Sequence, residues 1–81
     1  MERIATRWDF RWYLIADKAE GFVTRTYALY ETAYNADGKP ISHSAVPAHR
    51  DDFDSQARAA EAIKEASSKP ALDPETLEPI P

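Results

Sequence analysis

The chain has 81 residues, the size of one small domain, and its ten Lys and Arg against fourteen Asp and Glu give a formal net charge of -4. This acidic balance excludes a protein that binds nucleic acid mainly through positive charge, because such binding depends on neutralising phosphates. With no Cys for disulfides or zinc ligation and no apolar run as long as a membrane span, we expect a cytoplasmic protein without a membrane partner.

Residues 8–15 have the alternating pattern that predicts a half-buried β-strand. One side of this strand would carry Trp8, Phe10, Trp12 and Leu14. The polar residues 17–21 end in Gly21, which tolerates a positive φ, and they predict the turn into a second strand. Residues 22–34 are rich in Thr, Tyr and Val, which favour a pleated surface, and they predict that strand.

A hairpin and then a helix are predicted in the second half of the chain. The Asp-Gly pair at residues 37–38 indicates a turn, with residues 39–44 as the returning third strand. The density of Ala, Glu, Arg and Lys predicts a helix over residues 55–68, capped by the Asp and Ser residues before it and ended by Pro70. Its apolar stripe is expected to contain Phe53, Ala57, Ala60 and Ile63.

These elements predict an α+β fold in the order β-β-β-α, with a three-stranded antiparallel sheet and one helix packed on one face. Residues 1–81 are expected to form a single domain with a compact part from about residue 6 to residue 73. Residues 74–81 are expected to be a flexible, loosely ordered C-terminal tail.

The segment Tyr27–Ser42, followed by a charged helix and then Lys69–Asp73, resembles short uncharacterised bacterial and phage-borne proteins. The resemblance covers about residues 10–75, and its shared motifs are hairpin and helix-stop signals. The helix departs from those proteins, because residues such as Ala57 and Ala60 stand where they carry Leu or Met. The resemblance implies the β-β-β-α fold, and a phage or prophage origin would make the chain an inhibitor or adaptor of a host system.

Catalytic and metal-binding groups are sparse, so we expect no enzyme, no cofactor and no metal site. His43 and His49 are six residues apart in a strand and a loop, a spacing that fits no helical ligand pair, and zinc needs three or four convergent ligands. Gly21 and Gly38 are the only glycines, and each is needed for a turn. A Gly-rich phosphate loop is therefore excluded.

The aromatic residues divide between the two faces of the predicted sheet. The face with Trp8, Phe10 and Trp12 is expected to form the core beneath the helix, because these side chains offer the largest apolar surfaces. The opposite face, which one helix leaves uncovered, would carry Arg11, Tyr13, Arg25, Tyr30 and Tyr34. Two arrangements remain open for this second face: it contacts a partner, or the C-terminal tail folds back over it.

We therefore predict a small non-enzymatic module that binds another protein or itself through the Tyr-bearing face. Large apolar side chains are scarce for so short a chain, which favours a homodimer. The alternative is an acidic decoy that mimics nucleic acid with Asp51, Asp52, Glu61 and Glu65. Nucleic acid itself is not an expected partner, because residues 1–25 carry five bases against four acids.

Overall fold

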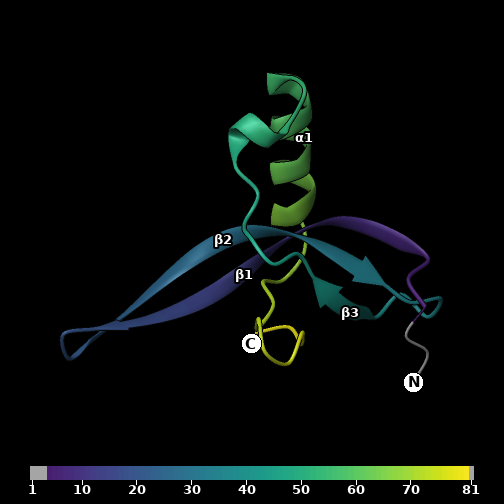
Figure 1. The fold of residues 1–81 in the computed structure, drawn as a ribbon. Coiled ribbons are helices and arrows are strands. Elements are labelled where there is room, and N and C mark those ends of the chain that lie inside the picture. The colour runs from purple at the N-terminus through teal and green to yellow at the C-terminus, as the bar shows by residue number, and fades with distance from the viewer. Residues whose placement is uncertain (1–3, 81) are drawn as a thin grey trace.

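The computed structural model describes residues 4–80, except for the side chains of Asp17 and Ala19. The strands β1 (Arg7–Ala19), β2 (Phe22–Tyr34) and β3 (Pro40–His43) form an antiparallel sheet in the order β1-β2-β3. A short 3-10 helix, η1 (Arg50–Asp52), precedes the helix α1 (Gln56–Ser67), which rises from one side of the sheet (Figure 1). The predicted α+β fold of three strands and one packed helix is confirmed. Within the described part of the chain, no helix is long and apolar enough to cross a membrane.

The hairpin of β1 and β2 is longer than the sequence pattern predicts. The two strands pair over 13 residues each, and β1 continues to Ala19 where alternation predicts a strand only to residue 15. Glu20 and Gly21 alone make the turn, with φ of 51° and 83°, the backbone of a tight hairpin turn whose twist matches its strands. Because the register has no bulge, each pair of opposed residues in β1 and β2 follows from this turn.

The distal end of the hairpin extends beyond the rest of the molecule. β3 pairs only with residues 32–34 of β2, and Leu72 bridges β1 only at Tyr13. Beyond these contacts, residues 15–27 continue as a twisted two-stranded ribbon, seen at the left of Figure 1, which we call the arm. The radius of gyration is 13.5 Å, against about 12 Å expected for a compact domain of this length.

The segment of residues 70–80 covers the Tyr-bearing face of the sheet. The Leu72 amide donates to the Trp12 carbonyl at 2.9 Å, and the Leu14 amide donates to the Leu72 carbonyl at 3.1 Å. Residues 73–80 then fold into a loop, closed by the Ile80 amide donating to the Ala71 carbonyl at 2.9 Å. Of the two arrangements open from the sequence, the structure has the one in which the C-terminal segment lies against this face.

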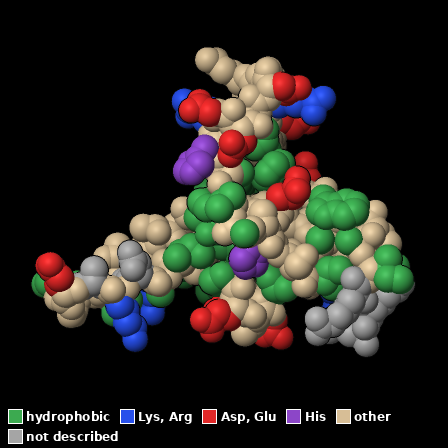
Figure 2. Space-filling view, viewed as in Figure 1, with side chains coloured by type: hydrophobic (Ala, Val, Ile, Leu, Met, Phe, Trp, Pro, Cys, Tyr) green, Lys and Arg blue, Asp and Glu red, His purple; other side chains and the backbone are tan. Residues whose placement is uncertain are grey.

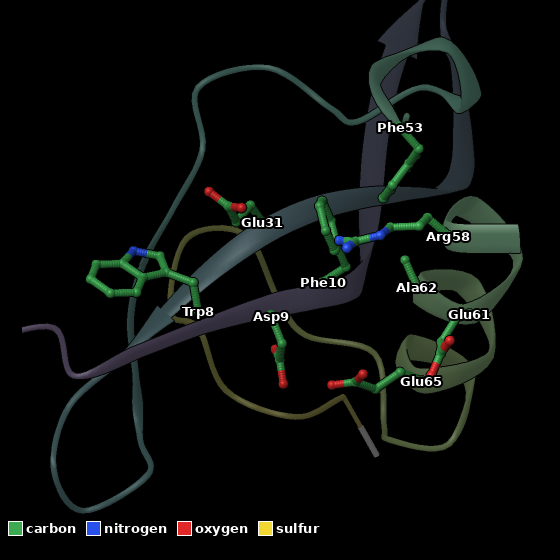
Figure 3. A pocket seen from close by; sticks show the side chains of 9 residues that line it. All are labelled: Trp8, Asp9, Phe10, Glu31, Phe53, Arg58, Glu61, Ala62 and Glu65. Carbon is green, nitrogen blue, oxygen red and sulfur yellow. The ribbon is translucent and has the colours of Figure 1, made fainter. Parts of the chain in front are cut away.

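The helix face of the sheet is packed less tightly than expected. Trp12 donates its indole N–H to the Ser67 hydroxyl at 2.9 Å, but it is only half-buried, and Trp8 remains 58% exposed. On α1 the buried residues are Ala59 and Ala66, so the predicted stripe is corrected by a rotation of the helix. The small methyl groups of that stripe cover Trp12 only in part, and Trp8 lies beyond Phe10 on the side away from the helix (Figure 3).

Candidate functional site

The five residues predicted to form a contact face do not share an open surface. Tyr13 and Tyr34 are 0% and 1% exposed, Arg11 is buried, and Tyr30 is half-buried. Arg25 alone is exposed; it lies on the arm, and its pairing with Ala16 places its side chain on the helix side of the sheet, so its predicted place on the Tyr-bearing face is wrong. The expectation that this face is uncovered is therefore corrected, because the segment of residues 70–80 occupies it.

Hydrogen bonds attach these buried side chains to the fold. Arg11 donates one guanidinium N–H to the Tyr34 hydroxyl at 3.0 Å and another to the Pro70 carbonyl at 2.8 Å. The Tyr13 and Thr32 hydroxyls lie 2.7 Å apart. Burial raises the pKa of Tyr34 to about 12, so its hydroxyl stays protonated at neutral pH. The Tyr34 hydroxyl therefore helps to hold Arg11, and Arg11 anchors the C-terminal segment at Pro70.

His43 belongs to the same structural network. Its ring centroid lies 5.0 Å from those of Tyr13 and Tyr30, and its two nitrogens lie 2.7 Å from the Ser44 carbonyl and 3.2 Å from the Pro74 carbonyl. The imidazole therefore connects β3 to the C-terminal segment. Among residues 4–80, no group of three or more His, Cys, Asp or Glu side chains is placed to hold a metal ion.

A hollow of about 500 Å³ lies on the other side of the sheet, between α1 and the first part of β1 (Figure 3). Its apolar lining consists of Trp8, Phe10, Phe53 and Ala62, and its acidic lining of Asp9, Glu31, Glu61 and Glu65. One basic residue, Arg58, also lines the hollow, and its side chain extends from α1 toward Phe10 (Figure 3). We call this hollow the aromatic groove. Figure 2 shows acidic side chains next to apolar ones where the helix meets the sheet.

Strand pairing and helix capping place the rings of the aromatic groove. Glu31 lies opposite Phe10 in the ladder, so both side chains leave the sheet on the helix side. The Phe53 ring packs on Phe10 with centroids 5.0 Å apart, at an interplanar angle of 54°. Phe53 is held there by the turn before α1, in which the Ser55 hydroxyl caps the helix by accepting from the Arg58 amide at 3.1 Å.

The charges around the aromatic groove are only partly neutralised. The Lys69 ammonium lies 2.7 Å from the Asp9 carboxylate and 3.8 Å from that of Glu65. Burial alone would raise the pKa of Asp9, but hydrogen bonds from Lys69 and Tyr34, together with the positive charges of Lys69 and Arg7, outweigh burial and hold the pKa below the usual value. Glu31 and Glu61 form no ion pair with any residue that the structure describes.

The four acids of the decoy alternative have different surroundings. Glu61 and Glu65 line the aromatic groove, whereas Asp51 and Asp52 lie in η1. The Asp52 carboxylate accepts from the His49 amide at 2.7 Å and so has a capping role. Only two of the four acids therefore border the same surface hollow.

Sequence reasoning did not identify the aromatic groove, although part of the signal was present. A turn centred on Glu20 and Gly21 fixes which residues are opposed, and it places Glu31 beside Phe10 on the helix side. The contribution of Phe53 depends on how the turn before α1 folds, which no periodicity indicates.

We compared the chain with known protein families, curated proteins and solved structures. No protein-family model, no curated protein and no solved structure matches the chain. Function is therefore inferred from the chain's own residues.

Proposed function

We propose that the chain is a small non-enzymatic protein-binding module whose aromatic groove takes an Arg or Lys side chain of a partner protein. The observation that carries this proposal is the exposed indole of Trp8, which has the unpaired carboxylate of Glu31 as its neighbour on the adjacent strand. The unpaired carboxylate of Glu61 lies across the same hollow, on α1 (Figure 3). A cation over a Trp ring gains about 0.5–2 kcal/mol, depending on how far water is excluded. A carboxylate beside it adds a charge-assisted hydrogen bond.

The openness of the groove favours a protein over a small molecule as the partner. Trp8, Glu31 and Glu61 are all exposed, so the hollow is a surface depression. Small-molecule sites bury most of their ligand inside a cleft or cavity. Protein interfaces, in contrast, are commonly built around an aromatic ring or an Arg with polar groups at the rim.

The wider setting of this module follows from the same reasoning and from the resemblance. The lack of Cys fits a reducing compartment, and we place the module in the cytoplasm. A phage or prophage origin would make the partner a host protein that the chain inhibits or adapts. Whether the chain inhibits or adapts that host protein, the groove would hold a basic side chain of it.

An NMR titration with a defined peptide tests the proposal. The probe is an acetylated and amidated Gly-Arg-Gly-Arg-Gly peptide, and its control carries the neutral isostere citrulline in place of Arg. We expect the Arg peptide to shift the indole N–H signal of Trp8, while that of Trp12 stays in place because it donates to Ser67. The citrulline peptide should shift neither, since it carries no positive charge.

Matched variants separate the groove from general charge attraction. Trp8→Ala and Glu31→Gln should weaken binding of the Arg peptide about fivefold or more, whereas Glu75→Gln, which removes an exposed carboxylate outside the groove, should change it less than about twofold. Equal losses from Glu31→Gln and Glu75→Gln would contradict the proposal. Binding that ignores Trp8→Ala and disappears at high salt would favour the acidic decoy instead.

A further inference from the structure

The arm exposes large apolar side chains away from the aromatic groove. Phe22 and Tyr27 are 74% and 66% exposed, and Val23 between them is exposed as well. A hairpin of two strands is marginally stable in water by itself, and a third strand or a packed layer normally supports it. The arm has neither among the described residues of this chain.

The outer edge of β2 in the arm has unpaired backbone groups with a defined direction. The carbonyls of Leu29 and Glu31 accept from the Ala48 and Ser44 amides, on the side of β2 that faces away from β1. The N–H and C=O groups of successive residues in a strand point alternately to its two sides. Because the pairing of β2 with β1 has no bulge, this alternation is unbroken, and all odd-numbered residues of β2 present their N–H and C=O groups at the outer edge. Val23 and Arg25 therefore offer free backbone groups to another strand.

We propose that two copies of this chain pair antiparallel through the arm edge of β2, joining their hairpins into a four-stranded sheet. In such a symmetric pair, the two-fold axis passes midway between one residue and the same residue of the second copy. Centring the axis on Arg25 would oppose two like charges, which is unfavourable across a ladder. Centring it on Thr24 opposes Val23 to Arg25 of the second copy and lets both residues form hydrogen-bonded pairs.

The charge distribution favours a second copy as the occupant. Residues 15–27 contain two acids and two bases, so the arm is neutral, although the whole chain carries a net charge of -4. Pairing at the arms brings neutral segments together and keeps the acidic remainders apart. The edge also lacks Pro and bulges, two of the devices by which proteins protect an exposed strand from pairing, and Arg25 is the one charged residue of β2 within the arm.

The area available fits a small, reversible interface. Phe22 opposes Ala19 and Tyr27 opposes Leu14, so the two rings leave opposite faces of the arm, and strand pairing covers only part of each. An aromatic side chain buries about 150–250 Å² when fully covered, so the exposed parts of both rings in two copies set an upper limit of roughly 550 Å². Val23, the Thr side chains and the paired backbones add to this value. The sum lies at the low end of interface sizes, which is the range of weak, reversible dimers.

Cysteine cross-linking tests both the dimer and its register, because the chain has no Cys of its own. In the Thr24-centred pair, Thr24 faces its own copy at a non-hydrogen-bonded position, where the Cα atoms lie close enough for a disulfide. Thr26 faces Phe22 of the other copy and lies far from its own equivalent. Both are exposed Thr residues of the same strand, so Thr26→Cys is the matched control for Thr24→Cys.

We expect Thr24→Cys to form a covalent dimer under mild oxidation at least tenfold faster than Thr26→Cys. Sedimentation equilibrium of the unmodified chain should show a reversible dimer, and Glu31→Gln in the aromatic groove should leave it unchanged, so this proposal stands or falls separately from the proposed function. Equal cross-linking at the two positions would overturn the register and the interface. If the chain stays monomeric at every concentration up to about 1 mM, the dimer proposal is overturned. A Kd of about 1 mM corresponds to an association free energy of only about 4 kcal/mol.

Discussion

The helix α1 covers one face of the sheet and the irregular segment of residues 70–80 covers the other. The irregular segment buries the side chains beneath it more completely than the helix does. The helix α1 lies over the face with the largest rings, yet Trp8 there remains 58% exposed. Residues 70–80 have no helix or strand of their own, yet beneath them Tyr13 is 0% exposed. The difference follows from the contacts. A stripe of Ala on α1 offers little surface, whereas Leu72 and the backbone around it bond directly to β1.

The largest expected effect comes from removing one ring from each face. Tyr13→Ala should lower the free energy of unfolding by about 3–5 kcal/mol, because the ring is fully buried and packs against Tyr30 and His43. Trp8→Ala should cost less than about 1 kcal/mol, since most of the indole already contacts water. Urea denaturation of both variants measures the contrast. A greater loss from Trp8→Ala would reverse the roles of the two faces.

The second comparison concerns one apolar residue from each cover. Leu72→Ala should cost about 2–4 kcal/mol, because Leu72 is buried between the strand and the C-terminal loop. Ile63→Ala on α1 should cost about 1 kcal/mol, since Ile63 is partly exposed. Thermal unfolding followed by circular dichroism gives both values. Similar losses would show that helix and loop contribute equally to the core.

Alkaline pH should weaken the fold through Tyr34. The folded pKa of about 12 lies above the ordinary 10.0, because burial disfavours the tyrosinate. A raised folded pKa means that the stabilisation is complete below about pH 10 and is lost as the pH rises toward about 12. Tyr34→Phe should flatten the fall of the unfolding free energy with pH over this window. Tyr27→Phe, at an exposed position, is the control and should leave the fall unchanged.

Much of the fold was predictable because its signals are local. Gly21 and Gly38 have φ of 83° and 80° at the turns where they were expected, and Ser55 caps a helix that ends before Pro70. The cover over the Tyr-bearing face carries no such signal. Leu72 is placed by backbone hydrogen bonds to Trp12 and Leu14, and a sequence does not show the partners of irregular backbone.

The candidate site was predictable only in part, for the same reason. Alternation placed Trp8 and Phe10 together on the helix side, and this pairing of side chains holds in the structure. The depth of burial depends on what covers them, and α1 does not extend over Trp8, so part of the expected core is an exposed groove (Figure 3). The five residues predicted as a contact face were instead divided between a buried network and the arm.

The smallest expected contrast separates a half-covered ion pair from an exposed one. Asp9→Asn should cost about 1 kcal/mol, because it breaks the 2.7 Å contact with Lys69, whereas Asp54→Asn should cost nearly nothing, because its pair with Arg58 is exposed to solvent. The lowered pKa of Asp9 means that its contribution is present above the ordinary value of 3.8 and lost as the pH falls through the folded pKa. Acid titration of the unfolding free energy in both variants checks the magnitude and the sign.

Amide hydrogen exchange along β1 tests most directly whether the C-terminal segment is an integral cover. The even-numbered residues of β1 face its outer edge, where the Leu14 amide donates to the Leu72 carbonyl and the Ala16 amide, in the arm, has no partner among residues 4–80. We predict strong protection of the Leu14 amide and fast exchange at Ala16, two residues further along the same edge. Exchange at Leu14 as fast as at Ala16 would contradict the account, because it would show that residues 70–80 do not stay on the sheet.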